Sequence, residues 1–214
     1  MTPPATSVED FVHVFEPATV PDTPALLLLH GTGADERDLL PLGRALAPGS
    51  ALLSPRGKVD ENGMNRWFRR LREGVFDVED LIERTAELAG FVEAATAAYD
   101  LDPERIVVSG FSNGANTGAG LLLLNPGLFV GAALFAGGAP LQGREPAPVD
   151  LSGTRVFLGN GAADPITPVG QARLLASQLG ERGADVVVHE HPGGHQLTPE
   201  VLAGAQDWFS RAEF

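Results

Sequence analysis

The feature that most constrains this chain is a serine between glycines, where a predicted strand meets a predicted helix. An apolar run at 105–109 predicts a buried strand, Gly110-Phe111-Ser112-Asn113-Gly114 follows it, and small residues at 113–124 predict a helix. A sharp turn here strains the serine backbone and exposes its hydroxyl above the sheet, while the glycines avoid collisions with strand and helix. Such a motif also occurs in ordinary glycine-rich loops, but both flanking elements are present here. Ser112 is therefore the candidate nucleophile.

An acid and a histidine follow the serine in the chain order that such a nucleophile requires. Asp164 comes shortly after a predicted strand at 154–161, and His195 follows a predicted strand at 184–190. Open sheets with parallel strands build their sites at the carboxyl ends of the strands. A neutral histidine can remove the serine proton, and a carboxylate can orient the ring and stabilise its charged form. We therefore expect Ser112, Asp164 and His195 to form a catalytic triad.

Other polar residues compete for these roles. His191 lies at the end of the strand that precedes His195, and we expect it to pack or to face solvent. His189 shares a strand face with His191, a spacing that also occurs in metal sites. No nearby residues complete a ligand set, so we expect no metal. Asp150 precedes its strand instead of following it, which makes it a weaker candidate than Asp164 for the acid.

A second glycine-rich turn supplies candidate donors for a developing negative charge. The apolar strand predicted at 25–30 is followed by Gly31-Thr32-Gly33. In sites of this type one N–H comes from the residue after the nucleophile, here Asn113, and another comes from the loop after an early strand. Thr32 is the natural second donor. The alternative is an ordinary turn before a helix that is capped by Asp35.

The alternation of strands and helices predicts an α/β fold with a mostly parallel central sheet and helices on both faces. We expect one domain over residues 1–214, in which the first strand pairs as an antiparallel edge. The expected strands are 11–15, 24–30, 50–54, 105–109, 129–135, 154–159 and 184–190. The expected helices are 35–47, 78–99, 113–124, 168–182 and 198–211.

Charge and composition exclude several classes of function. Fifteen basic and 28 acidic residues give a net charge of −13, which disfavours nucleic acid and anionic membrane surfaces as partners. The absence of cysteine excludes disulfides, thiolate metal sites and a cysteine nucleophile. No apolar run is long enough to span a bilayer, and the first residues lack a secretory signal pattern. We therefore expect a cytoplasmic protein.

Four segments resemble the small phospholipase/carboxylesterase group of α/β-hydrolases, which includes acyl-protein thioesterases and compact bacterial carboxylesterases. They are His30-Gly31-Thr32-Gly33-Ala34-Asp35-Glu36, Gly110-Phe111-Ser112-Asn113-Gly114-Ala115, Asp164-Pro165-Ile166-Thr167-Pro168 and Gly194-His195. The stretch from Arg66-Trp67-Phe68 to Asp77 resembles the bacterial carboxylesterase branch. This resemblance implies a three-layer α/β-hydrolase fold without a cap domain, no cofactor, and often a homodimer. Thioesterase members usually carry leucine where this chain has Thr32.

These observations predict a serine hydrolase that cleaves small to medium carboxylic esters through an acyl-enzyme intermediate. A thioesterase or lysophospholipase using the same triad is the alternative among enzymes. A non-catalytic binding protein with the hydrolase fold is the alternative from another class, because a fold alone does not determine function. Such proteins typically lack a triad member, whereas all three candidates are present here.

The stretch 56–76 is the candidate substrate wall, in which Trp67, Phe68 and Phe76 are expected to line an acyl pocket. Residues 56–72 hold six basic and two acidic side chains, a net charge of +4 in an acidic protein. One interpretation is a site for esters that carry a carboxylate. The favoured interpretation is pairing of these arginines with the acids at 73–80, since exposed ion pairs are common and contribute little.

Overall fold

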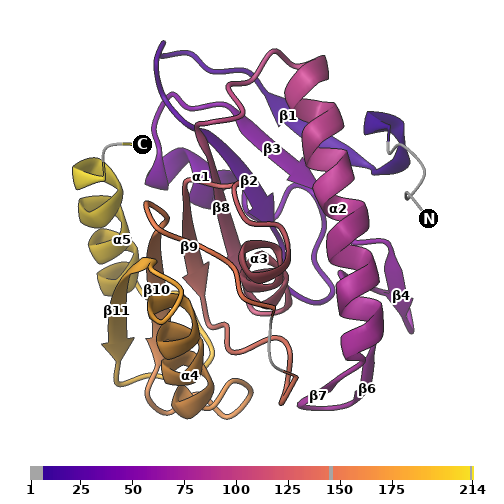
Figure 1. Ribbon diagram of the computed structural model, residues 1–214, viewed down its shortest axis with the longest axis vertical. Helices are drawn as coiled ribbons and strands as arrows, with labels where there is room; N and C mark the ends of the chain where they lie inside the picture. The colour runs from indigo at the N-terminus through magenta and orange to yellow at the C-terminus, as the bar shows by residue number, and fades with distance from the viewer. Residues whose placement is uncertain (1–6, 145–146, 213) are drawn as a thin grey trace.

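The computed structural model describes residues 7–144, 147–212 and 214, and a seven-stranded sheet forms its centre (Figure 1). The N-terminal segment 1–6 lies outside the described residues. Neighbouring strands run in the order β1 (His13–Glu16), β3 (Leu52–Pro55), β2 (Ala25–Leu29), β8 (Ile106–Phe111), β9 (Gly131–Phe135), β10 (Arg155–Gly161) and β11 (Asp185–His191). As predicted, β1 is an antiparallel edge strand, and all the other neighbours pair in parallel.

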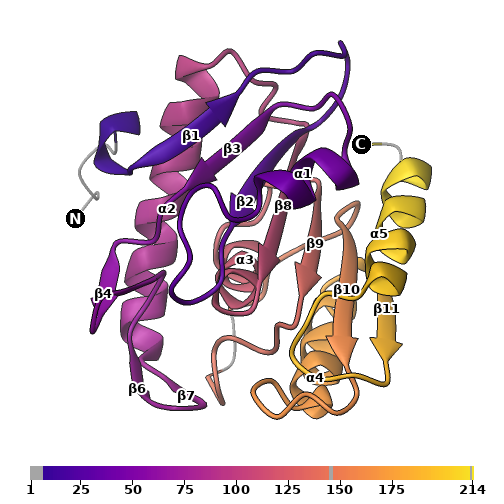
Figure 2. The same cartoon turned by 180° about the vertical axis from the view of Figure 1, so that it is seen from behind.

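Helices cover both faces of the sheet, which gives the three layers that the sequence predicts. The helices are α1 (Leu40–Leu46), α2 (Val78–Ala98), α3 (Asn113–Leu124), α4 (Val169–Gly180) and α5 (Pro199–Arg211). One face carries α2, α3 and α4, and the opposite face carries α1 and α5 (Figures 1 and 2). A short 3₁₀ turn, Val8–Asp10, precedes β1 and contacts α2.

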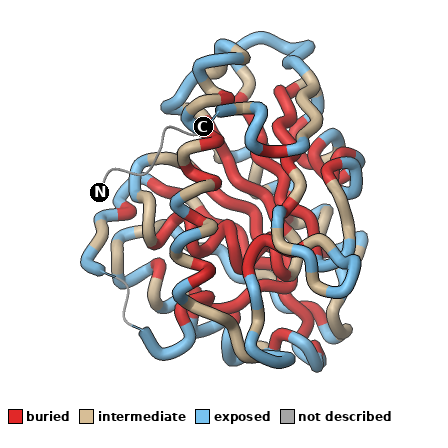
Figure 3. The backbone as a smooth tube through the Cα atoms, turned by 90° about the vertical axis from the view of Figure 1, so that its right-hand side faces the viewer, coloured by how far each residue is buried: buried red, intermediate tan, exposed pale blue. Residues whose placement is uncertain are grey.

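The central strands are buried on both faces, as the red segments inside the blue rim show (Figure 3). Strand β2 is the clearest case, since all five of its residues are buried. Leu27 and Leu29 belong to the core cluster beneath α2 and α3, whereas Leu26 and Leu28 face the cluster beneath α1 and α5. The period of two along a strand thus explains why this run is apolar without interruption.

The first helix is shorter than predicted. We expected a helix over 35–47 with Asp35 as its cap, but α1 begins at Leu40 and the preceding residues 36–39 form turns. The Asp35 carboxylate accepts a hydrogen bond from the backbone N–H of Arg37, two residues along the chain. This local bond favours a turn over a helix, as short polar side chains commonly do.

Two small hairpins that the sequence did not predict connect β3 to α2. Strand β4 (Val59–Glu61) pairs with β5 (Met64–Arg66), and β6 (Arg70–Arg72) pairs with β7 (Val75–Phe76). The second hairpin lies at the end of the molecule toward which the parallel strands β9 and β11 point (Figure 1). The segment is therefore placed beside the carboxyl ends of the sheet strands, where sites form in such folds.

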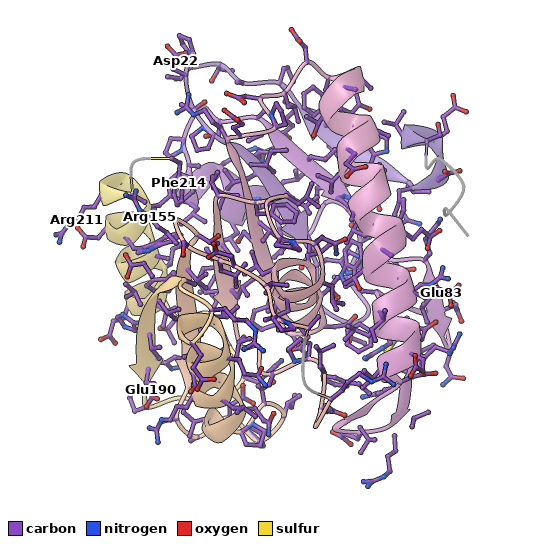
Figure 4. All side chains as sticks on the ribbon, viewed as in Figure 1. Asp22, Glu83, Arg155, Glu190, Arg211 and Phe214 are labelled. Carbon is purple, nitrogen blue, oxygen red and sulfur yellow. The ribbon has the colours of Figure 1, made fainter. Side chains whose placement is uncertain are left out.

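The opposite edge of the sheet is formed by β11, a mixture of exposed and partly buried residues that ends in a buried histidine. Its pairing with β10 continues in register from Arg155–Asp185 to Gly161–His191. On its outer side Glu190 accepts hydrogen bonds from Arg173 of α4 at 2.7 Å, at the molecular edge (Figure 4).

Candidate active site

Ser112 lies at the tight turn between β8 and α3. Its backbone has φ 54° and ψ −113°, outside the common regions for a residue with a side chain. Its N–H donates to the carbonyl of Phe135 at 2.8 Å, which fixes the turn to the neighbouring strand. Such a conformation costs about 1–3 kcal/mol, so the surrounding structure must hold it.

The two glycines of the motif are required by close backbone approach. A Cβ atom at Gly110 would lie 2.6 Å from the carbonyl oxygen of Gly114. At Gly114 it would overlap the carbonyl oxygen of Leu29, on the adjacent strand β2. The serine turn therefore depends on both glycines, as the motif predicts.

Ser112, His195 and Asp164 form a continuous line of hydrogen bonds. Nε2 of His195 lies 2.8 Å from Oγ of Ser112, and Nδ1 lies 2.7 Å from Oδ2 of Asp164. An ionised carboxylate only accepts hydrogen bonds, so Nδ1 carries a proton and Nε2 is free to accept the serine proton. This is the geometry of a nucleophile, a base and an orienting acid.

Backbone donors hold Asp164 in place. Its other oxygen, Oδ1, accepts from the N–H groups of Ile166 at 2.8 Å and Thr167 at 2.9 Å. The Asp164 side chain is fully buried, whereas 14% of the His195 side chain is exposed. The acid is thus shielded from water while the ring stays accessible from the site.

The pairing of β10 with β11 brings these two loops together. Ala162 donates from its backbone N–H to the carbonyl of His191 at 2.7 Å, and Ala163 donates to that of Gly193 at 3.0 Å. Asp164 and His195 each follow within a few residues. The relative position of acid and base therefore depends on the edge strand β11.

The competing residues take other places. His191 is buried, and its Nδ1 accepts from the backbone N–H of Gly193 at 3.1 Å instead of contacting the serine. Nε2 of His189 lies 4.0 Å from Glu200. Asp150 accepts from the N–H of Ser152 in its own exposed loop. Over residues 7–144, 147–212 and 214, no three histidine, cysteine, aspartate or glutamate side chains are grouped so that they could hold a metal ion.

The residues predicted to donate to an oxyanion both border the pocket at Ser112. Asn113 is the first residue of α3, where backbone N–H groups have no intrahelical acceptor. Within the described chain, the N–H of Thr32 donates to no backbone carbonyl. Both groups can therefore face a bound ligand.

The segment Arg66–Trp67 fixes both of these residues through their side chains. Nη1 of Arg66 donates to Oγ1 of Thr32 at 2.8 Å, and the N–H of Trp67 donates to Oδ1 of Asn113 at 2.9 Å. The indole of Trp67 also donates to the carbonyl of His30 at 2.8 Å. Sequence reasoning assigned no such role to Arg66, which it noted only as one of the six basic residues of 56–72 and as part of the segment that resembles the bacterial branch.

His30 supports the same loop as a neutral side chain. Its Nε2 accepts from the N–H of Gly57 at 3.0 Å, and its Nδ1 lies 2.7 Å from the carbonyl of Gly31. A backbone N–H can only donate and a carbonyl can only accept, so the proton is on Nδ1. Burial lowers the pKa of His30, which keeps this neutral form stable.

An ion pair fixes the end of this loop to the start of the candidate wall. Glu36 is buried and accepts from Nε and Nη2 of Arg56 at 2.6 and 3.0 Å. The hydrogen bonds from Arg56 hold the pKa of Glu36 below its usual range, and Arg37 adds a second positive charge. The charged form of Glu36 is therefore the one that the fold stabilises.

The site opens into a pocket of about 640 Å³. Its lining includes Ser112 and both predicted oxyanion residues, together with Phe76, two arginines and the loop that follows Asp164. The full lining is Thr32, Arg66, Arg70, Glu73, Gly74, Phe76, Ser112, Asn113, Asn116, Gly138, Ala139, Gln142, Gly143, Pro165, Ile166, Thr167, Pro168, Gln171 and Leu174.

The structure corrects part of the predicted acyl wall. Trp67 and Phe68 are only 3% and 1% exposed and belong to the core cluster beneath α2, so they do not line the pocket. Their rings pack inward because the indole N–H has a buried acceptor at His30 and Phe68 stacks edge-on against Phe76 at 5.0 Å. Of the three expected residues, Phe76 alone borders the pocket.

Three arginines of this stretch test the two interpretations of its charge. Arg69 pairs with Asp77 and Asp80, as the favoured interpretation predicted. Arg66 and Arg70 instead share Glu61, at 3.6 and 2.8 Å, and both border the pocket. Two of the six basic residues are thus part of the site.

Among the helices that the structure describes, none has both the length and the apolar surface needed to cross a membrane.

Comparison with known proteins places these observations among relatives. The sequence model of the Phospholipase/Carboxylesterase family matches residues 12–212. The chain is 42% identical to the protein MhqD of Bacillus subtilis over 94% of its own length and 98% of the relative's. It is also 42% identical to a Bacillus cereus carboxylesterase of known structure, covers 94% of both chains, and superposes with a TM-score of 0.91. A carboxylesterase from Mesorhizobium loti is 32% identical over 88% of both chains, with a TM-score of 0.82.

Proposed function

The chain belongs to the phospholipase/carboxylesterase family and has its α/β-hydrolase fold, and from this membership we propose a carboxylesterase that uses Ser112 as its nucleophile. One observation carries the proposal: His195 lies 2.8 Å from the serine hydroxyl and 2.7 Å from Asp164. A family whose members hydrolyse esters and a serine that is hydrogen-bonded to an oriented base together favour acyl transfer through an acyl-enzyme.

In the first half of the proposed reaction, His195 takes the proton from Ser112 as the serine oxygen attacks the ester carbonyl. A new carbon–oxygen bond forms, and the carbonyl π electrons move to its oxygen. When the tetrahedral species collapses, the bond to the alkoxide breaks and His195 returns the proton to that leaving group. Asp164 keeps the ring oriented and stabilises its positive charge throughout.

In the second half, water replaces the alcohol. His195 removes a proton from water, the hydroxide attacks the acyl-enzyme, and Ser112 leaves with the proton that His195 returns. The backbone N–H groups of Thr32 and Asn113 would donate to the oxyanion in both halves. Losing one such donor costs about 3–4 kcal/mol of transition-state stabilisation in a comparable enzyme. Each step uses side chains, backbone groups and water, so no cofactor enters the proposal.

We propose small to medium esters in solution as the substrates, hydrolysed within a single domain over residues 1–214. The pocket volume of about 640 Å³ supports this range, because small-molecule sites commonly measure 300–1,000 Å³. Acyl thioesters would react by the same steps, so kcat/KM measured on a matched series of esters and thioesters ranks the two substrate classes.

A cytoplasmic location and a homodimer stay predictions. Sedimentation velocity measures the oligomeric state.

A fluorophosphonate probe tests the nucleophile. We expect one covalent adduct on Ser112, located by mass spectrometry of the digested protein, together with loss of ester hydrolysis. Ser112→Ala should remove both labelling and turnover. Ser109 is buried on the preceding strand, so Ser109→Ala is the matched control and should still be labelled. An adduct on any other serine, or none on folded protein, would contradict the proposal.

A further inference from the structure

We infer that the pocket recognises esters that carry a second, anionic group, and that Arg66 and Arg70 bind this group as a carboxylate. The inference rests on the proposed function, because it concerns the substrate class of the same site. It goes beyond ester hydrolysis as such, in which a neutral ester would serve equally well.

Arg66 is a buried cation with an incompletely used guanidinium. Only 4% of its side chain is exposed, yet it borders the pocket that contains Ser112. Its Nε donates to the carbonyl of Phe68 at 3.2 Å and its Nη1 donates to Thr32 at 2.8 Å. Within the described residues Nη2 has no hydrogen-bond acceptor, and it is not among the buried polar atoms that lack a partner. The exposed part of this side chain therefore opens toward the pocket.

The charges around Arg66 leave it poorly neutralised. Oε2 of Glu61 lies 3.6 Å from Nη1 of Arg66, whereas Oε1 accepts a hydrogen bond from Nε of Arg70 at 2.8 Å, so one carboxylate is shared by two guanidinium groups. Burial lowers the pKa of Arg66, which reflects the cost of a cation held away from water. Glu73 also borders the pocket, but it is exposed at the rim. A carboxylate that reaches Arg66 would gain charge-assisted hydrogen bonds in a partly desolvated place.

The position of Arg66 determines where the bound anion would lie relative to the ester that is cleaved. The same guanidinium that would bind the carboxylate holds Thr32, one of the proposed oxyanion donors. The second negative charge of the substrate would then lie on the side of the pocket that bears the oxyanion loop. Half-esters of short dicarboxylic acids have this arrangement, with an ester at one end and a carboxylate at the other.

A matched pair of substrates tests the inference. Ethyl hydrogen glutarate and its amide, ethyl glutaramate, have the same chain length and nearly the same shape, but the amide lacks the charge. We expect the wild-type protein to favour the acid in kcat/KM by about tenfold to a hundredfold, as charge-assisted hydrogen bonds predict. Added salt should reduce this ratio.

Variants assign the preference to particular residues. Arg66→Gln and Arg70→Gln should bring the acid-to-amide ratio close to one, while Arg66→Lys should retain part of it. Arg72→Gln is the control, because Arg72 is exposed on the same hairpin and does not border the pocket. A wild-type ratio of one or less overturns the inference. So does an Arg66→Gln variant that loses activity on both esters equally, since Arg66 would then only support the loop.

Two readouts separate this inference from the proposed function. If wild type hydrolyses ethyl glutaramate and Ser112→Ala does not, the proposed function is supported whatever the acid-to-amide ratio of kcat/KM is. Saturation-transfer NMR compares the binding of glutarate with that of its monoamide, and so tests the anion site without turnover. Glutarate binding that disappears in Arg70→Gln but persists in Ser112→Ala supports the anion site even if no ester is hydrolysed. Equal binding of both compounds contradicts it.

Discussion

Arg66 and Thr32 are joined by a hydrogen bond of 2.8 Å between a buried guanidinium and a threonine hydroxyl. The bond links the hairpin segment to the turn that follows β2. It also means that the side chain of Thr32 positions the residue, while its backbone N–H donates to no backbone carbonyl of the described chain and can serve a ligand.

Replacing Thr32 tests this link. Thr32→Val keeps the volume and the backbone N–H but leaves Nη1 of Arg66 without its acceptor, so the loop should shift. We expect kcat for a neutral ester to fall about tenfold, with a smaller change in KM, because the oxyanion exists only in the transition state. Thr32→Ser keeps the hydroxyl and should retain most of the activity. Equal losses in both variants would show that the hydroxyl is not what positions the loop.

The triad residues should act as one unit. Ser112→Ala and His195→Ala are each expected to lower kcat by about 10³–10⁶, and the double variant should be little worse than either. His191→Ala is the control, because His191 contacts the neighbouring loop and not the serine. Steady-state kinetics measures these rates. Additive losses, or an inactive His191→Ala beside an active His195→Ala, would contradict the assignment.

Asp164→Asn tests the orienting acid by itself. An amide in place of the carboxylate can present an N–H to Nδ1 of His195, which favours the wrong tautomer and removes the stabilising charge. We expect a loss of about 10³–10⁴ in kcat with the unfolding midpoint lowered much less. Kinetics and thermal unfolding, measured on the same preparation, separate the two effects. Activity close to wild type would show that another group orients the base.

His30 predicts a pH dependence of stability. Because burial lowers its pKa in the folded state, the unfolded chain takes up the proton first as the pH falls. Neutral His30 therefore makes its full contribution to the free energy of unfolding above the pKa of the unfolded state, about 6.5. That contribution is lost as the pH falls from this pKa toward the lower pKa of the folded state. Urea unfolding between pH 7.5 and 5.5 measures this loss.

The variant His30→Gln should be less stable than wild type at pH 7.5 and should lose less stability on acidification. His189→Gln is the matched control, because it removes a histidine that lies outside this loop and whose side chain is 28% exposed. If His30→Gln loses as much stability as wild type over this range, other groups must carry the dependence.

Phe76 should contribute to selection among acyl chains. It borders the pocket, so Phe76→Ala should raise KM more for a hexanoate ester than for acetate, since each buried methylene contributes about 0.8 kcal/mol. Trp67→Ala should instead lower the unfolding midpoint and impair both esters alike, because Trp67 is in the core. Parallel KM series for the two variants decide between these roles. Equal effects of Phe76→Ala on both esters would exclude it from the acyl contact.

The sequence predicted the elements that its periodicity and motifs define. The sheet strands fall close to their expected ranges because long apolar runs bounded by turns have few alternatives. Ser112, Asp164 and His195 could be placed together because each follows a strand of a parallel sheet, whose carboxyl ends meet at one edge. Their hydrogen bonds agree with that reasoning.

The stretch from 56 to 77 could not be predicted in the same way. Its four strands are two or three residues long, and three of them carry charged side chains, so no alternation of apolar and polar residues marks them. Two adjacent aromatic residues in a loop can point inward or outward, and the inward direction of Trp67 depends on a buried acceptor at His30 that is 37 residues away in the chain. The bond between Arg66 and Thr32 joins residues 34 apart, which no local pattern records.

The dependence of the Asp164–His195 pair on β11 has a consequence for how the protein is inactivated. Strand β11 is one of the two edge strands of the sheet, and four of its seven residues are exposed, so we expect it to open at a lower free energy than the central strands. A fluctuation that detaches it would separate the base from its acid while the central strands stay paired. Gentle heating would then abolish turnover before circular dichroism detects any loss of secondary structure. In this inactive but largely folded state, the backbone amides of residues 185–191 would exchange fast.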